Sequence, residues 1–294
     1  MIKRMLIFGG KGFVGKYLSR TASGFCDVTV FGREVDVCNR NQVADTISKL
    51  KPDYVINLAA ISSIPESFSD PILCKEINFG GTLNILDGLK RANFCGSFLF
   101  VSSSQVYGQV TSDFLPINER HICLPSNPYG HSKLSAEHAC VHYSTFSEFK
   151  TIIARPFNHV GSGQSSKFVI PSIVEQIKNI QLGNDTALRL GNLDSTRDFL
   201  HVSDVARAYI ELLENGKNGS AYNVCSGKET SISTVVKELL DIIGIDVEVL
   251  QGVYSEGINS VQRVYGDNSK ILEQTSWKPA LNFRSTLEKC LIEN

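Results

Sequence analysis

Short apolar runs alternate with longer amphipathic segments from the N-terminus to about residue 214. Continuous apolar runs are typical of strands in a parallel sheet that is covered on both faces, whereas the amphipathic segments have the period of helices. Strands that alternate with helices predict an α/β fold built on a Rossmann-type, doubly wound parallel sheet. The predicted strands are residues 5–9, 28–32, 54–60, 98–102 and 151–155, and the predicted helices are residues 12–23, 41–50, 71–91, 129–149 and 203–214.

The last third of the chain is less regular. Short strand-like segments at residues 188–190 and 221–224 are interleaved with helices such as residues 231–243. We expect a smaller α/β lobe over the carboxyl ends of the strands, where doubly wound proteins bind ligands. The predicted division is a larger sheet domain, residues 1–157 plus about 195–224, and a smaller lobe, residues 158–194 and 225–294.

Composition narrows the class of protein. The chain has 294 residues, of which 42% are hydrophobic and 20% charged, and its net charge is −1. These values are typical of a globular enzyme and argue against a nucleic acid partner. No apolar run is as long as a bilayer span, and the N-terminal residues lead directly into a strand without an export signal. We therefore expect a cytoplasmic protein without a membrane partner, whose eight cysteines are reduced thiols rather than disulfides.

A glycine-rich loop follows the first predicted strand. Gly9, Gly12 and Gly15 have the spacing G-x-x-G-x-x-G between a strand and a helix. The first glycine allows a tight turn, the second lets a pyrophosphate approach the backbone, and the third lets the helix pack on the strand. The amides at the helix start favour phosphate, so the loop predicts a bound dinucleotide. The candidate cofactor-binding residues are Gly9, Gly12, Phe13, Val14, Gly15, Arg33, Asp36, Val37, Leu58, Ala59, Ala60, Tyr129 and Lys133.

Arg33 bears on the identity of that dinucleotide. It follows the second predicted strand, where NAD-binding folds usually have an acidic residue and where an arginine accommodates a 2′-phosphate. Arg33 therefore favours NADPH, although Glu34 comes directly after it and NADH stays possible. The alternative is that Arg33 stacks on the adenine or faces solvent. Asp36 and Val37 could reach the adenine ring, or simply belong to a solvated loop.

Tyr129 and Lys133 are the candidate catalytic pair. They are four residues apart, so a helix places them on one face, one turn apart. A nearby ammonium favours phenolate, so we expect Tyr129 to lose and regain its proton more easily than a free tyrosine. Such a phenol suits a carbonyl–alcohol redox site. Ser103 and Ser104 follow a predicted strand, and a hydroxyl there could hydrogen-bond a substrate carbonyl.

With these motifs the chain resembles the extended short-chain dehydrogenases/reductases that act on nucleotide sugars. The resemblance implies that Ser103 orients the carbonyl, that Tyr129 is the acid/base, and that Lys133 lowers the pKa of Tyr129 and holds the nicotinamide ribose. The family's 4,6-dehydratases have acidic residues directly after the catalytic Ser or Thr, where this chain has Ser104 and Gln105. Neither can act as a carboxylate acid or base, which leaves reduction or epimerisation at sugar C4.

Three strings in the distal half extend the resemblance to GDP-4-keto-6-deoxy-D-mannose reductases, which form GDP-D-rhamnose. They are Arg-Pro-Phe-Asn-His-Val-Gly-Ser-Gly-Gln at residues 155–164, the Arg-Asp-Phe segment within residues 191–204, and Tyr-Asn-Val-Cys-Ser-Gly at residues 222–227. The resemblance implies that Asn158 contacts the diphosphate or the sugar and that Arg197 contacts the diphosphate or a ribose. The alternative for Arg197 is an ion pair with Asp198 or Asp204. The candidate substrate-binding residues are Ser62, Ser103, Ser104, Gln105, Asn158, Arg197 and Arg263.

One stretch departs from the family pattern. Relatives have an Arg-Pro-Ser-Glu string that helps to hold the pyrophosphate, whereas this chain has Val253-Tyr-Ser-Glu256. Arg263 could replace the missing arginine. Ser62 could contact the hexose or be an ordinary polar loop residue.

These observations predict an NADPH-dependent reductase of a nucleotide-linked 4-keto-6-deoxyhexose, in deoxysugar biosynthesis for surface polysaccharide. The alternatives are a nucleotide-sugar 4-epimerase with tightly bound NAD, a reductase of a dTDP- or UDP-linked sugar, and a non-catalytic dinucleotide sensor. No metal is expected, since His138 and His142 have no third ligand at a useful spacing. Relatives use the helices that correspond to residues 71–91 and 129–149 in a dimeric bundle, so we expect a homodimer.

Overall fold

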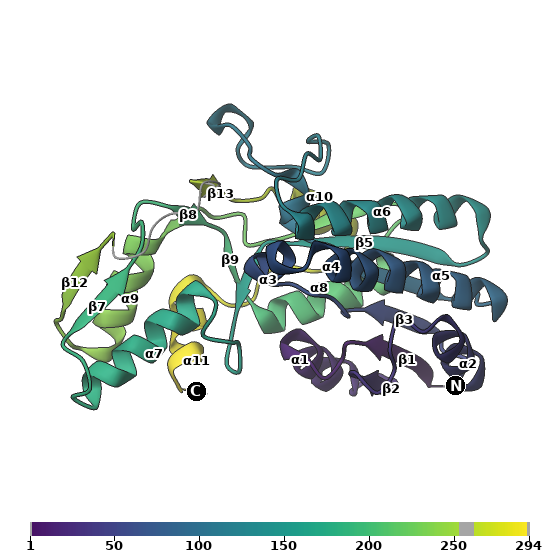
Figure 1. Ribbon diagram of the computed structural model, residues 1–294, viewed down its shortest axis with the longest axis horizontal. Coiled ribbons are helices and arrows are strands. Elements are labelled where there is room, and N and C mark those ends of the chain that lie inside the picture. The colour runs from purple at the N-terminus through teal and green to yellow at the C-terminus, as the bar shows by residue number, and fades with distance from the viewer. Residues whose placement is uncertain (1, 253–261, 293–294) are drawn as a thin grey trace.

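A parallel sheet of six strands forms the larger part of the computed structural model, which describes residues 2–252 and 262–292 (Figure 1). The strand order is β10-β5-β4-β3-β1-β2, and every neighbouring pair is parallel. The prediction of a Rossmann-type, doubly wound sheet is confirmed. The order reverses between β1 and β3, so the crevice at their carboxyl ends is where such sheets bind ligands. The strands are β1 (Lys3–Phe8), β2 (Cys26–Phe31), β3 (Tyr54–Asn57), β4 (Ser97–Val101), β5 (Lys150–Pro156) and β10 (Ala221–Val224).

Helices cover both faces of this sheet, because its strands are apolar on both sides. On one face α1 (Phe13–Ala22) and α8 (Val202–Asn215) pack together over a core that includes Tyr209. On the other face lie α2 (Arg40–Leu50), α5 (Gly81–Arg91) and α6 (Pro128–Phe146). No helix within the described ranges is both long and apolar enough to span a bilayer.

Three predicted elements differ in detail from the structure. The helix predicted over residues 71–91 consists of α4 (Pro71–Lys75), a π-helical turn η1 (Glu76–Gly80) and α5. The strand predicted over residues 54–60 ends at Asn57, whose side chain accepts a hydrogen bond from the amide of Ala59 and so turns the chain. The helix predicted over residues 129–149 ends at Phe146, because Ser147 is already extended. A short helix, α3 (Ile64–Ser69), was not predicted.

The C-terminal lobe begins where β5 leaves the main sheet, so it lies at the carboxyl edge of that sheet (Figure 1). Its own core lies between helices and a two-stranded sheet. Shorter strands connect the lobe to the main sheet. The lobe contains α7 (Val169–Gln181), β7 (Ala187–Leu190), α9 (Ile232–Ile243), β12 (Glu248–Gln251) and α11 (Phe283–Ile292); the connecting elements are β6 (Asn158–Val160), β8 (Thr196–Arg197), β9 (Phe199–His201), β11 (Thr230–Ser231), β13 (Arg263–Val264) and α10 (Ser269–Gln274).

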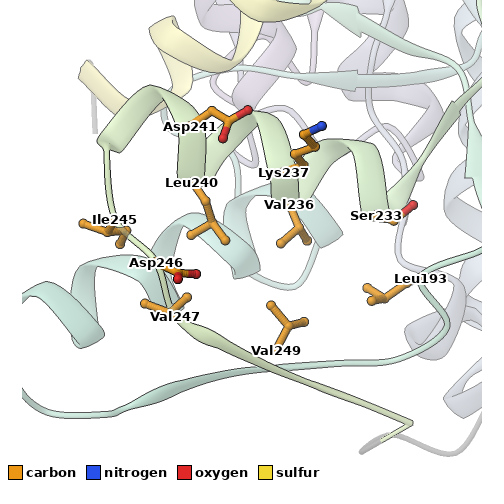
Figure 2. A pocket seen from close by; sticks show the side chains of 10 residues that line it. All are labelled: Leu193, Ser233, Val236, Lys237, Leu240, Asp241, Ile245, Asp246, Val247 and Val249. Atoms are coloured by element: carbon orange, nitrogen blue, oxygen red, sulfur yellow. The ribbon is translucent and has the colours of Figure 1, made fainter.

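A surface groove of about 490 Å³ lies between α9 and β12 in this lobe (Figure 2). No candidate site residue from the sequence lines it, so the groove is separate from the chemistry considered below. Its lining residues are Leu193, Ser233, Val236, Lys237, Leu240, Asp241, Ile245, Asp246, Val247 and Val249.

Candidate active site

The glycine loop forms a tight cradle between β1 and α1. Gly9 has a φ of +73°, and a Cβ there would lie 2.5 Å from the amide nitrogen of Ala59. A Cβ on Gly15 would lie 2.3 Å from the carbonyl oxygen of Gly10. Gly12 caps α1 without a side chain, so the first amides of that helix have no side-chain partner at the cap. A side chain at Gly9 or Gly15 would therefore collide with the neighbouring backbone, and the loop with its uncapped helix start fits a dinucleotide pyrophosphate.

The remaining cofactor candidates lie at neighbouring strand ends. Leu58, Ala59 and Ala60 are half-buried after β3, where Gly9 packs against them. Val37 is buried. Asp36 is exposed, and its carboxylate accepts a hydrogen bond from the amide of Cys38. These residues follow the carboxyl ends of β2 and β3, the edge of the sheet where doubly wound proteins bind ligands.

The charged residues after β2 are Arg33 and Glu34, and among the described residues only Glu34 has an ion-pair partner. Arg33 is exposed and has no ion pair within the described residues, whereas Glu34 lies 2.7 Å from the Nζ atom of Lys11. The hydrogen bond from Lys11 lowers the pKa of Glu34 to about 2. Glu34 is thus ionised but balanced by Lys11, and Arg33 keeps its positive charge for a ligand. This arrangement fits a 2′-phosphate better than a bare ribose hydroxyl.

The candidate catalytic residues come together at the carboxyl end of β4. Ser103 follows that strand, and its Oγ accepts a hydrogen bond from the amide of Gln105. Asn127 caps α6 by accepting a hydrogen bond from the amide of Gly130 at 2.8 Å, so that Tyr129 stands in the first turn. The hydroxyl of Ser103 lies near enough to the phenol of Tyr129 to act on its pKa, and each residue is only 8% exposed. The structure therefore brings the predicted hydroxyl and phenol into contact.

Lys133 lies one turn along α6 and is 2% exposed. Its Nζ donates a hydrogen bond to the carbonyl oxygen of Val101 at 2.8 Å and lies 5.9 Å from the centre of the Tyr129 ring. Burial lowers the pKa of Lys133 to about 8. The ammonium is thus held by the backbone of β4, beside the phenol but not hydrogen-bonded to it.

The expected acidification of Tyr129 by Lys133 is wrong. Burial raises the pKa of Tyr129 to about 12, and the hydrogen bond with Ser103 only partly opposes that rise. Lys133 does not contribute to lowering this pKa, because its own charge is disfavoured by burial and its Nζ is directed at Val101. Tyr129 is therefore a protonated phenol, which is the form that a proton donor needs.

The two residues that follow Ser103, the candidate catalytic serine, have no carboxylate. Ser104 is buried, and the side-chain oxygen of Gln105 accepts a hydrogen bond from Asn127 at 3.0 Å. Ser62 is exposed in the loop after β3, next to Ser63, which caps α3. Nothing in the structure brings Ser62 into contact with the Ser103–Tyr129 pair.

Arg197 presents a guanidinium without a carboxylate partner in the described part of the chain. Its Nη1 donates only to the carbonyl oxygens of Thr196, at 2.7 Å, and Gln262, at 3.3 Å. Burial lowers the pKa of Arg197. The alternative of an ion pair is wrong, because Asp204 pairs with Arg207 instead, at 2.6 Å.

Asp198, the other suggested partner, accepts hydrogen bonds from Ser226, Gly227 and Gly266. Burial raises the pKa of Asp198 to about 6 despite those bonds. Asn158 is half-buried on β6, where it pairs with Phe199 of β9. Asp198 thus binds the loops around Arg197 and forms no ion pair with it among the described residues.

Arg263 already forms an ion pair with Glu229. Its Nε and Nη2 donate to the two carboxylate oxygens of Glu229 at 2.7 and 2.8 Å. Glu229 also accepts a hydrogen bond from Thr196. The strand β13 places Arg263 beside Thr196, next to Arg197. Residues 253–256, where the family arginine is missing, lie outside the described residues.

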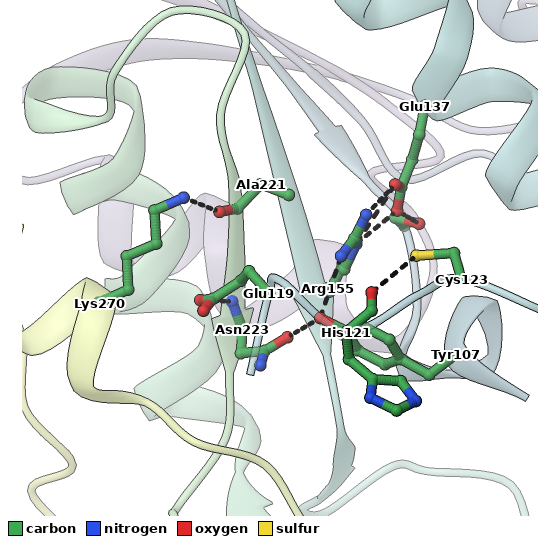
Figure 3. A network of polar contacts seen from close by, with 10 residues as sticks. Tyr107, Glu119, His121, Cys123, Glu137, Arg155, Ala221, Asn223 and Lys270 are labelled. Carbon is green, nitrogen blue, oxygen red and sulfur yellow. Dashed lines mark hydrogen bonds and ion pairs between the residues drawn. The ribbon is translucent and has the colours of Figure 1, made fainter. Parts of the chain in front are cut away.

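Sequence reasoning missed a buried polar network beside the catalytic residues (Figure 3). Glu137 and Arg155 form a buried ion pair with an N–O distance of 2.6 Å. Tyr107 is buried, and its hydroxyl is hydrogen-bonded to Arg155 and Asn223. A signal was present, because Glu137 is four residues after Lys133 and therefore on the same helical face.

Asn78 was also missed. It lies in the π-helical turn η1 and donates hydrogen bonds to the Oγ atom of Ser132 at 2.9 Å and to the carbonyl oxygen of Ile61 at 3.0 Å. Ser132 stands between Tyr129 and Lys133 on α6, so Asn78 connects the loop after β3 to the catalytic helix. No sequence pattern indicated the π turn that places it there.

Comparisons with known proteins agree with this geometry. Residues 26–290 match the family model described as GDP-mannose 4,6 dehydratase. A GDP-6-deoxy-D-mannose reductase from Pseudomonas aeruginosa is 39% identical, and the alignment covers 99% of this chain and 97% of the relative. A GDP-6-deoxy-D-talose 4-dehydrogenase from Aggregatibacter actinomycetemcomitans is 30% identical, with 92% of this chain and 90% of the relative covered. The solved structure of RMD from Pseudomonas aeruginosa complexed with NADPH has a TM-score of 0.91 and 38% identity, and 99% of each chain is covered.

Proposed function

We propose that this chain, which belongs to the GDP-mannose 4,6-dehydratase family, is an NADPH-dependent reductase that converts GDP-4-keto-6-deoxy-D-mannose to GDP-D-rhamnose. The observation that carries the proposal is the buried phenol of Tyr129 beside the hydroxyl of Ser103, with Ser104 and Gln105 as the next residues along the chain. A proton donor for a ketone is present, whereas the positions next to Ser103 have no carboxylate for eliminating water. The identity of 39% to a GDP-6-deoxy-D-mannose reductase supports the same conclusion.

The residues of the site have complementary tasks in this proposal. NADPH, when bound, supplies the hydride that is added to C4 of the sugar. Tyr129 gives its phenolic proton to the oxygen of the C4 carbonyl, so the ketone becomes an alcohol with one hydride and one proton added. Ser103 donates a hydrogen bond to the same oxygen as negative charge develops on it. Lys133, whose Nζ donates to the carbonyl oxygen of Val101, would hold the nicotinamide ribose.

The cofactor assignment rests on the glycine cradle and on Arg33. The cradle at Gly9, Gly12 and Gly15 would hold the pyrophosphate, and Arg33 would contact the 2′-phosphate that distinguishes NADPH from NADH. The RMD relative with 38% identity was solved in complex with NADPH. NADH is the weaker candidate, because Glu34, the nearest carboxylate, is paired with Lys11.

The substrate assignment rests on Arg197. A guanidinium that donates only to backbone carbonyls can hold a diphosphate through charge-assisted hydrogen bonds. Asn158 would contact the sugar or the diphosphate. The reductase at 39% identity and the dehydrogenase at 30% identity are both named for GDP-linked 6-deoxyhexoses, and the two sugars in those names differ in configuration at C4. The higher identity favours the rhamnose configuration for this chain.

The test is a substrate panel. Purified protein is mixed with NADPH and GDP-, dTDP- or UDP-linked 4-keto-6-deoxyhexoses, and the loss of NADPH absorbance is followed. We expect the highest kcat/KM with the GDP-linked sugar, and NMR of the product should show the D-rhamnose configuration. A co-purified NAD that stays bound, with interconversion of 4-hydroxyl epimers and no NADPH consumption, would instead establish a 4-epimerase.

We propose further that the protein is a cytoplasmic homodimer that supplies deoxysugar for surface polysaccharide. Free thiols at all eight cysteines suit a reducing compartment. Exposed apolar side chains lie on α3, α4 and α6, at a face that a second copy would cover. Light scattering of the purified protein should give twice the chain mass, and Ile72→Glu should shift it toward the monomer. The exposed apolar side chains on α3, α4 and α6 are those of Phe68, Ile72, Leu73, Val141 and Phe146.

A further inference from the structure

A buried ion pair lies directly behind the catalytic residues. Glu137 of α6 accepts three hydrogen bonds from Arg155 of β5, two at Nε and one at Nη2, with distances of 3.0, 3.2 and 2.6 Å (Figure 3). Removing two charges from water costs free energy that their attraction often fails to recover, so a buried ion pair is weak evidence of added stability. The contacts of the pair suggest another role.

Glu137 holds the segment that leads into the catalytic serine. The Oγ of Ser102 donates a hydrogen bond to Oε1 of Glu137 at 2.5 Å. One residue earlier, the carbonyl oxygen of Val101 accepts a hydrogen bond from Lys133. Helix α6 thus fixes two successive residues at the end of β4, and Ser103 is the next residue along the chain. The orientation of Ser103 follows from both contacts.

Arg155 holds the other end of the same turn. Its Nη1 donates a hydrogen bond to the hydroxyl of Tyr107 at 3.0 Å, and that hydroxyl donates to Oδ1 of Asn223 at 2.7 Å. Tyr107 is the last residue of the 3₁₀ turn that begins after Ser103. Asn223 in turn donates to the carbonyl oxygens of Ile117 and Asp267, at 2.8 and 3.2 Å. The turn is therefore clamped at its start by Glu137 and at its end by Arg155.

We propose that the Glu137–Arg155 pair is a positioning element that holds Ser103 in hydrogen-bonding reach of Tyr129 and of the substrate carbonyl. Neither side chain takes part in proton or hydride transfer. The inference rests on the proposed reductase function for its kinetic consequence. Loosening the clamp should lower kcat while leaving NADPH affinity nearly unchanged, because the glycine cradle lies on different elements. A small misplacement of a catalytic group is enough to slow turnover up to a hundredfold.

The experiment compares three variants with a matched control. Ser102→Ala removes only the bond to Glu137, Tyr107→Phe removes only the bonds of the phenol, and Glu137→Gln removes the charge with little change in shape. The control is Arg207→Gln, which breaks the ion pair of α8 with the buried carboxylate of Asp204, away from the catalytic residues.

We expect kcat to fall about tenfold in Ser102→Ala and about 10- to 100-fold in Glu137→Gln, with the Kd for NADPH within twofold of the wild type. Arg207→Gln should lower the Tm without lowering kcat. Wild-type kcat in Ser102→Ala, a variant that should fold normally, would overturn the proposal. So would a loss of kcat that is matched by an equal loss of NADPH affinity, since that pattern indicates general unfolding.

Hydrogen exchange of the chain without substrate provides an independent measurement. The amides of Gln105 and Val106 are bonded to the side chain and the carbonyl of Ser103, so their exchange reports the turn itself. It should become faster in Ser102→Ala and Glu137→Gln and stay unchanged in Arg207→Gln. Unchanged exchange in both variants would overturn the proposal. If the wild type reduces none of the sugars in the panel, the proposed function fails and exchange alone decides this inference.

Discussion

The end of the main sheet that carries the candidate catalytic residues and the short connecting strands at the base of the C-terminal lobe hold their charges in opposite ways. At the sheet, Lys133, Glu137 and Arg155 are buried, and each already has its partners within the chain. On these connecting strands, Arg197 donates, among the described residues, only to carbonyl oxygens, and Arg263 forms an ion pair with a partly exposed glutamate. The first arrangement is preorganised for a reaction, whereas the second leaves positive charge for a ligand. We therefore expect changes at the sheet to alter kcat and changes in the lobe to alter KM.

The largest effect should come from Tyr129→Phe. Because burial raises the pKa of Tyr129 to about 12, the phenol is the protonated donor across the working pH range, and removing it should lower kcat about a thousandfold. The Kd for NADPH, measured by fluorescence, should stay within twofold. Turnover close to that of the wild type would contradict the role given to this residue.

Arg197→Met tests the expectation that changes in the lobe alter KM. Losing charge-assisted hydrogen bonds to a diphosphate should raise KM for the nucleotide sugar about 10- to 100-fold with little change in kcat. Arg263→Met is the matched control, because this side chain is already paired with Glu229 and should change KM less than about threefold. Equal increases in KM in the two variants would contradict a specific role of Arg197 in binding the diphosphate.

The Kd for NADPH should depend on pH through the protonation state of Lys133. Burial lowers its pKa to about 8, so the ammonium is lost in the free protein as the pH rises from 7 to 9. The charged form favours an anionic cofactor, so Kd should be flat below pH 7 and rise toward tenfold per pH unit above pH 8. Titrations at several pH values would measure this, and Lys133→Met should remove the slope. A slope that persists in the variant would assign it to another group.

The smallest effect should come from the charges at the end of β2. Arg33→Ser should lower the preference for NADPH over NADH about fivefold to tenfold, since an exposed guanidinium contributes a modest share of phosphate binding. Glu34→Gln should raise that preference slightly, because it frees Lys11. Ratios of kcat/KM for the two cofactors measure both changes. A preference that is unaffected by Arg33→Ser would place the 2′-phosphate elsewhere.

The difference between the main sheet and the C-terminal lobe also explains which features could be predicted from the sequence. Strands such as β1 and β4 were predicted within two residues, because buried parallel strands are continuous apolar runs with helices between them. Gly9, Ser103 and Tyr129 were found because their spacing along strand ends and helix turns is fixed by regular geometry. In the lobe the strands are only two to four residues long, too short for any period to be recognised.

Burial and partner choice were the features that the sequence did not reveal. The acidity of Tyr129 was predicted from the charge of Lys133, but desolvation of both groups dominates once the helix is packed. Two carboxylates stood within reach of Arg197 along the chain, yet both have other partners. Glu137 was not identified from the sequence, although its position on the helical face of Tyr129 and Lys133 indicated that it lies near them. Such choices depend on contacts between residues that are distant in sequence.

The position of β10 has a consequence for how the protein is made. This strand covers the edge of β5, yet it is separated from β5 by more than sixty residues that include most of the connecting strands and α7 and α8. During synthesis the first five strands leave the ribosome well before β10, so the edge of β5 must wait unpaired. An open strand edge is a template for association with other chains. Nascent chains that stall before residue 221 should therefore aggregate or recruit chaperones, whereas those that extend beyond α10 should not.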